Sequence, residues 1–160
     1  MKARKTKAQE TQDKTPGYQL LPHGMWHMVA AVSLMVFTIG IALITFTEIL
    51  GFWVEQPTLQ YIELALGVVM IFILSTPSFL LLRGRTSFYR FLVGHNLLYI
   101  AFLSGAALSL FLSGHQGMAI TSAFGLGLCV ISRVLYTSKG FHTGMEYYRA
   151  IWTYHRANRD

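Results

Sequence analysis

Residues 25–50 read MWHMVAAVSLMVFTIGIALITFTEIL, an apolar stretch without Lys or Arg whose one acidic residue, Glu48, comes near its end. About 20 such residues are enough for a helix to cross a hydrocarbon core about 30 Å thick. Because backbone N–H and C=O groups find no water in lipid, the chain must satisfy them internally, and a helix does so. The stretch therefore predicts a membrane-spanning helix.

Three more apolar stretches follow it, separated by short polar segments. The chain is 53% hydrophobic and 12% charged, whereas a soluble domain has about 25% charged residues. Spans are expected at about 25–50, 59–82, 91–112 and 117–136. Loops this short make consecutive helices antiparallel neighbours. The sequence predicts an all-α membrane protein with an antiparallel bundle of four transmembrane helices over residues 23–138.

Two polar segments flank the predicted bundle. Residues 1–22 are basic and rich in Lys, Thr and Gln, and we expect a disordered cytoplasmic tail there. Residues 139–160 predict an amphipathic helix, with aromatic and basic side chains at helical spacing. Such a helix suits the lipid headgroup level, where it would lie in the membrane interface. Docking on a cytoplasmic partner is the alternative, and the candidate docking residues are Tyr148, Arg149, Trp152 and Arg156.

The positive charges predict how the bundle is oriented. All thirteen Lys and Arg residues fall on one side: Lys2, Arg4, Lys5, Lys7 and Lys14 before the first span, Arg83, Arg85 and Arg90 between the second and third, and Arg133, Lys139, Arg149, Arg156 and Arg159 at or after the end of the fourth. Basic residues mark cytoplasmic loops, so both termini are expected in the cytoplasm. Basic residues that flank the spans and face anionic lipid headgroups account for the net charge of +6, and no nucleic-acid partner is expected. Short loops and the lack of a cleavable signal favour a bacterial inner membrane.

Four histidines are expected at a similar depth near the cytoplasmic side. They are His23, His27, His95 and His142. Such a set is compatible with a transition metal, and His27 with His95 is compatible with axial ligation of a b-type haem. The alternative is that all four bond headgroups, water or backbone at the interface. The spacing does not require a ligand, and no cofactor is assigned.

Two carboxylates approach the membrane from the opposite side. Glu48 ends the first span and Glu63 lies about one turn into the second. A charge inside a membrane is costly and often functional. Glu63 is therefore a candidate for binding a proton, a cation or a cationic partner, and an ordinary interfacial glutamate is the alternative.

Small residues at spacings of four predict where helices approach closely. They are Ala101, Gly105 and Ser109 on the third span and Ala119, Ala123 and Gly127 on the fourth. Small side chains let backbones come together in lipid. We expect a tight hairpin of these two spans, with contact to another protein's helix as the alternative. Pro77 predicts a kink in the second span, because proline lacks the N–H for the hydrogen bond to the preceding turn.

No catalytic motif is present: the chain has no HExxH, GxSxG, Walker or Rossmann glycine pattern. We therefore expect a protein without catalytic activity, acting as an accessory, scaffold or assembly subunit of a larger membrane complex, or as an immunity or regulatory protein. A small homo-oligomeric proton or cation transporter that uses Glu63 is one alternative. An electron-transfer subunit that binds haem or metal through His27 and His95 is another.

Overall fold

The computed structural model describes residues 22–157, and all regular secondary structure in that range is helical. The helices are α2 (Met25–Leu50), α3 (Thr58–Leu82), α4 (Phe88–Leu112), α5 (Gln116–Thr137) and α6 (Lys139–Ala157). Within the described range, α2 to α5 are the four helices long and apolar enough to cross a membrane. The expected all-helical class with four long apolar helices is confirmed. The expected N-terminal tail lies, up to residue 21, outside the described residues.

The four long helices begin and end within three residues of the expected spans. The largest difference is at the start of α4, which begins at Phe88 rather than at residue 91. Tyr89 and Arg90 in this first turn lower the local hydropathy without ending the helix. α3 continues through Pro77, which is buried. Ser78 Oγ donates to the Leu74 carbonyl oxygen in the same turn, at 2.7 Å.

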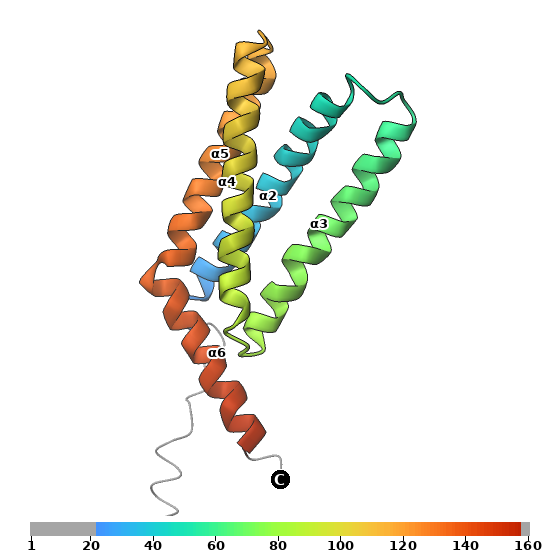
Figure 1. Cartoon of the computed structure of the whole chain (residues 1–160). Coiled ribbons are helices and arrows are strands. Elements are labelled where there is room, and N and C mark those ends of the chain that lie inside the picture. Colours follow the sequence, from blue (N-terminus) through green and yellow to red (C-terminus); the bar gives the residue numbers. More distant parts are fainter. Residues whose placement is uncertain (1–21, 158–160) are drawn as a thin grey trace, which may run out of the picture.

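The loops divide the molecule into two ends (Figure 1). One end carries the start of α2, the loop 83–87 between α3 and α4, and α6. Because Arg83, Arg85, Arg90, Lys139, Arg149 and Arg156 lie there, it is called the basic end. The loops 51–57 and 113–115 lie at the opposite end, called the far end, which carries Glu48, Glu55 and Glu63.

Three of the long helices form the core. α5 packs closely along both α2 and α4, whereas α3 makes fewer contacts with its neighbours. A Cβ at Gly125 of α5 would lie 2.6 Å from Ile41 Cγ2 and 3.3 Å from Leu103 Cδ1. Glycine at this position therefore lets α5 approach α2 and α4 together, and van der Waals contact of this kind drives helix association in lipid.

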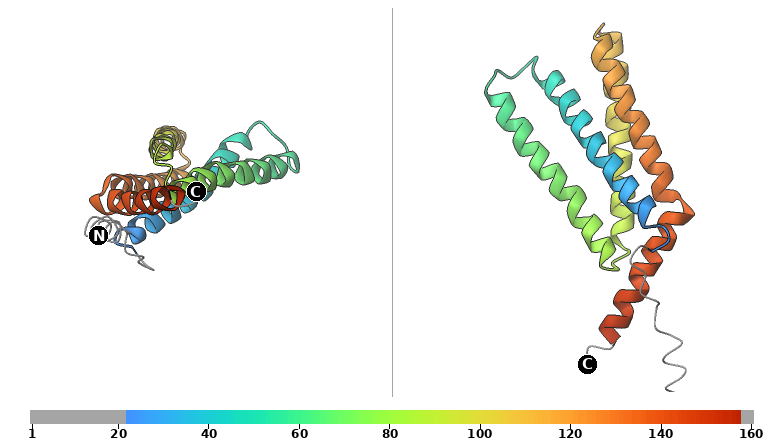
Figure 2. Two further views of the ribbon diagram at one scale, coloured as in Figure 1. Left: turned by 90° about the horizontal axis from the view of Figure 1, so that it is seen from below. Right: turned by 180° about the vertical axis from the view of Figure 1, so that it is seen from behind.

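The outer helix, α3, packs less closely than the others. Figures 1 and 2 show that α3 and α4 lie close at the basic end and diverge toward the far end, while α3 follows α2. The α3 residues that are buried are few: Leu59, Leu74, Pro77 and Leu81. Three of these four belong to the half of the helix near the basic end, which leaves a cleft between α3 and the core.

Helix α6 crosses the basic end below the core (Figures 1 and 2). The Phe141 backbone N–H donates to Ser138 Oγ at 3.2 Å, so Ser138 satisfies a free N–H in the first turn. Gly24 (φ +94°) precedes α2, and a Cβ there would overlap the Gly140 carbonyl oxygen. A Cβ at Gly144 would lie 2.9 Å from Met28 Sδ. These glycines let the start of α2 and the first half of α6 cross in contact.

Candidate functional site

A cleft lies between α2, α3 and α4. It has a volume of about 530 Å³, which is within the range of about 300–1,000 Å³ that small-molecule sites occupy. Its lining side chains are apolar except for His95 and Tyr99. The lining comes from α2 (Ile39, Ala42, Leu43, Phe46), α3 (Leu66, Met70, Ile73) and α4 (Phe91, His95, Leu98, Tyr99, Phe102).

His95 and Tyr99 bring polar atoms to this apolar surrounding. Each side chain is 8% exposed. Their rings meet edge to face with centroids 4.9 Å apart, and the His95 ring stacks on Phe91 at 6.0 Å. Among the described residues, neither His95 Nδ1 nor the Tyr99 hydroxyl has a hydrogen-bond partner. Leaving a buried polar group unpaired costs about 1–3 kcal/mol, and both atoms are covered by their neighbours rather than accessible in the cleft.

The other histidines of the predicted set have different surroundings. His27 packs against Gly140 of α6, where an added Cβ would lie 2.6 Å from His27 Nδ1. His142 Nε2 lies 3.5 Å from the Tyr89 hydroxyl, and His23 is exposed ahead of α2. No group of three or more His, Cys, Asp or Glu side chains that could hold a metal occurs in residues 22–157. Only His95 among the four lines the cleft.

The candidate carboxylates lie at the far end. Glu48 is exposed near the end of α2, and Glu63 is half-buried in the second turn of α3. Glu63 precedes Leu66, Met70 and Ile73 at spacings of three, four and three residues, so it lies on the cleft-lining face of α3. Glu63 is not itself part of the lining.

The small residues of α4 point away from the core. Ala101, Gly105 and Ser109 are all exposed, and among the described residues a Cβ at Gly105 would meet nothing within 4 Å. The same holds for Gly127 of α5, and Ala123 is exposed, whereas Ala119 is buried. The α4–α5 hairpin therefore packs through other residues, Gly125 and Leu103 among them. Gly105 and Gly127 lie outside this contact, contrary to the expected packing.

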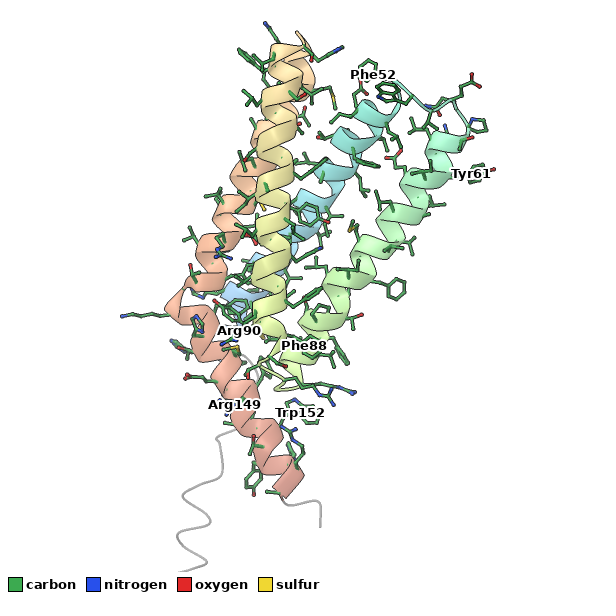
Figure 3. All side chains as sticks on the ribbon, in the orientation of Figure 1. Phe52, Tyr61, Phe88, Arg90, Arg149 and Trp152 are labelled. Atoms are coloured by element: carbon green, nitrogen blue, oxygen red, sulfur yellow. The ribbon has the colours of Figure 1, made fainter. Side chains whose placement is uncertain are left out.

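Trp152 of α6 contacts the end of α3 and the chain's own α3–α4 loop. Trp152 Nε1 donates to the Leu82 carbonyl oxygen at 2.9 Å. Gly84 (φ +77°) lies so close that an added Cβ would be 3.1 Å from Trp152 Cβ. Figure 3 shows Trp152 on α6 beside this loop, with Arg149 on the same helix. Neither of the two expected roles of this helix, lipid contact or partner docking, included this contact with the loop.

The other α6 docking residues differ in exposure. Tyr148 is half-buried, and burial together with the neighbouring Tyr147 raises its pKa above the ordinary value of 10.0. Its hydroxyl is therefore neutral at physiological pH, which suits a packed position. Arg149 and Arg156 are exposed. The basic side chains of α6 therefore lie at the surface, while Trp152 contacts the end of α3 and the loop that follows it.

Several polar residues to which the sequence analysis gave no role in helix packing join the core helices. Ser132 Oγ donates to the Ala31 carbonyl oxygen at 3.0 Å, which links α5 to α2. Asn96 Nδ2 donates to the Cys129 carbonyl oxygen at 3.0 Å, which links α4 to α5. Arg133, half-buried, donates to the Val93 carbonyl oxygen at 3.0 Å. Asn96 inside an apolar span was the available signal, because a polar amide in lipid requires a partner.

Comparison of the chain with protein-family models, curated proteins and solved structures finds no match. The fold and the cleft define a class, a small helical membrane protein with a cleft between three long apolar helices. The proposals below rest on the chain's own geometry.

Proposed function

We propose that this protein is a non-catalytic subunit of a larger helical membrane complex, and that it associates through the exposed face of α4. The observation that carries the proposal is the stripe Ala101, Gly105 and Ser109, which is exposed and has no role in the packing of the chain's own core.

Small residues on a lipid-facing surface favour close packing with another helix. Helices in lipid associate through close packing rather than through a hydrophobic driving force, since the lipid tails are equally apolar. A face with Gly and Ala at spacings of four lets another backbone approach closely. In α4 this face carries Ala101 and Gly105 around the middle of the helix, where a crossing helix would make most contact.

A groove beside this stripe supports the same proposal. It runs between α4 and α5 and is lined by Ala107, Leu108, Phe111, Ala119, Ile120 and Ala123. Half of these side chains are methyl groups, and all six are apolar. A transmembrane helix of another subunit would fit against such a surface without burying an unpaired polar group.

The proposed orientation follows from the charges. The basic end would face the cytoplasm, because short loops rich in Lys and Arg stay on that side. Anionic lipid headgroups would attract its arginines, by about 1 kcal/mol for each one near the surface. Both termini would then be cytoplasmic, and we place the protein in a bacterial inner membrane. Phe52 and Tyr61, which Figure 3 shows at the far end, would lie at the opposite interface.

The first experiment is to isolate the tagged protein in mild detergent and to analyse it by native gel and mass spectrometry. We expect other membrane proteins in stoichiometric amounts. Gly105→Leu should abolish their association while the purified chain keeps its own thermal stability, because position 105 is exposed and an added Cβ there meets nothing within 4 Å among the described residues.

Gly40→Leu is the matched control. Gly40 is also exposed on a long helix, α2, and an added Cβ there meets nothing within 4 Å among the described residues. This variant should keep the complex. A protein that migrates alone, or a complex that tolerates Gly105→Leu as well as Gly40→Leu, would contradict the proposal.

A further inference from the structure

Three arginines surround one glycine at the basic end, where the α3–α4 loop meets α6. Arg83 and Arg85 flank Gly84, which is buried and has a φ of +77°. A Cβ at Gly84 would lie 3.2 Å from Arg149 Cα and 3.1 Å from Trp152 Cβ, so the loop lies directly against α6 here. Figure 3 shows Arg149 and Trp152 on this helix, beside the loop. Because arginine side chains are long and flexible, all three guanidinium groups can reach one ligand next to Gly84.

These three side chains are exposed and have no acidic partner. In the part of the chain that the structure describes, Arg83, Arg85 and Arg149 form no ion pair. Glu146 is the one carboxylate among the described residues of the basic end, and it is exposed on α6 without an ion pair to Arg149. Like charges held in one place repel one another and lower the stability of the compact state. An anion bound among the arginines would remove this repulsion.

The position of Arg83 indicates the depth of these arginines in a membrane. Arg83 directly follows α3, one of the four helices long and apolar enough to cross a membrane. Its guanidinium carbon lies 4.7 Å from the centre of the Phe79 ring, and Phe79 is 55% exposed on α3. A cation over an aromatic ring at the end of an apolar helix is typical of the boundary between hydrocarbon and headgroups. In a bilayer the guanidinium group therefore lies at the level of the lipid phosphates.

An apolar surface continues from Arg83 along the outside of α3. Phe72 and Phe79 are 67% and 55% exposed. Spacings of seven and four residues place Phe72, Phe79 and Arg83 on one face of the helix. Neither phenylalanine lines the cleft between α2, α3 and α4, so this face is turned to the lipid. A free phosphate ion would make no use of such a surface, whereas the acyl chains of a phospholipid would pack along it.

We propose that the three arginines, Arg83, Arg85 and Arg149, bind the phosphate of an anionic phospholipid. The acyl chains of this lipid run along Phe79 and Phe72. Each guanidinium group presents N–H donors in a planar fork that matches the oxygens of a phosphate. Two of the arginines belong to the α3–α4 loop and one to α6, so the bound lipid joins the loop to the helix. Unlike the diffuse attraction of basic residues to an anionic leaflet, this binding gives one lipid a fixed position.

The test is a lipid titration of the purified, delipidated full chain in detergent at about 0.15 M salt, followed by native mass spectrometry. We expect saturable binding of phosphatidylglycerol. Phosphatidylcholine should need at least about tenfold higher concentrations, because the arginines repel its choline ammonium group. Glycerol 3-phosphate has the phosphate without acyl chains, and at about a hundredfold excess it should not displace the lipid. The experiment uses the isolated chain, so its outcome is independent of the proposed complex.

Arg149→Gln and Lys139→Gln form a matched pair on α6. Each removes one positive charge from an exposed position. Lys139 lies about 15 Å along the helix from Arg149, beyond the Debye length of about 8 Å at physiological salt. We expect Arg149→Gln to weaken phosphatidylglycerol binding about tenfold, and Lys139→Gln to weaken it less than about twofold. Arg149→Lys keeps the charge but loses the planar fork, so its affinity should lie between these two.

Thermal unfolding separates lipid binding from a structural role of Arg149. Its side chain makes no hydrogen bond or ion pair within residues 22–157, so Arg149→Gln without anionic lipid should unfold at the same midpoint as the wild type. Phosphatidylglycerol should raise this midpoint more in the wild type than in the variant. Equal binding of phosphatidylglycerol and phosphatidylcholine, equal losses of affinity in Arg149→Gln and Lys139→Gln, or displacement of the lipid by glycerol 3-phosphate would overturn the proposal.

Discussion

Thr45 and Ser122 are joined by a hydrogen bond of 3.1 Å between their hydroxyl oxygens, and both side chains are fully buried. They link α2 to α5 in the half of the core near the far end. Interhelical hydrogen bonds in membrane proteins contribute about 0.6 kcal/mol on average and up to about 1.7 kcal/mol. Van der Waals interactions between closely packed helices supply the rest of the free energy of association of α2 and α5.

A double-mutant cycle with Thr45→Val and Ser122→Ala measures the contribution of this hydrogen bond to stability. We expect a coupling free energy of about 0.5–1.5 kcal/mol, obtained from unfolding by steric trapping in bicelles. Thr121→Ala is the control, because Thr121 Oγ1 donates only to the Gly117 carbonyl oxygen of its own helix. Additive effects of Thr45→Val and Ser122→Ala would show that the two hydroxyls do not interact.

At the scale of elements, the crossing of α2 and α6 depends on Gly24. We expect Gly24→Ala to lower the free energy of unfolding by at least about 2 kcal/mol, because the residue has a positive φ and its new Cβ overlaps the Gly140 carbonyl oxygen. The same bicelle assay measures the effect.

Gly94→Ala is the matched control for this substitution. Gly94 lies inside α4, and its Cβ would meet nothing within 4 Å in the described part of the chain. Alanine there should leave stability equal or raise it by about 0.5–1 kcal/mol, since it favours the helix. A Gly24→Ala protein as stable as the wild type would show that α6 does not dock as described.

The hydrogen bond from Trp152 to the Leu82 carbonyl oxygen holds the end of α3. Carbonyl groups in the last turn of a helix lack partners within the helix. Trp152→Phe keeps the ring and removes the donor, so we expect faster amide hydrogen exchange in residues 83–87 and unchanged exchange in residues 51–57. Thr153→Ala should change neither, because Thr153 Oγ1 donates to the Arg149 carbonyl oxygen of α6 itself. Equal exchange rates in wild type and Trp152→Phe would contradict the stabilisation of the end of α3 by this hydrogen bond.

The positions of the helices could be predicted from the sequence, whereas the faces by which they pack could not. An apolar run of about 20 residues is a local property. Gly105 and Gly125 both lie among apolar neighbours, yet Gly105 is exposed and Gly125 contacts Ile41 and Leu103. Small residues indicate that a face permits close approach, but they do not identify the helix that uses it. The cleft around His95 also depends on the divergence of α3, which no local pattern encodes.

For the whole molecule, the separation of charge between the two ends predicts its orientation in the membrane. Ser87 and Ser113 are both exposed in loop positions, at the basic end and the far end respectively. In intact bacterial cells, a membrane-impermeant maleimide should label Ser113→Cys, and should label Ser87→Cys only after permeabilisation. The buried Cys129 should leave the wild type unlabelled. The reverse labelling pattern would contradict the orientation.

The central position of α5 has a consequence for how the protein is made. α5 packs on both α2 and α4, but it leaves the ribosome after both of them, since it ends at Thr137, α4 ends at Leu112 and α2 ends at Leu50. At about 5–20 residues per second, roughly 4–17 seconds separate the ends of α2 and α5. During that interval Thr45 has no Ser122 to bond. Until α5 is inserted, the faces of α2 and α4 that it later covers must therefore contact lipid or an insertion factor.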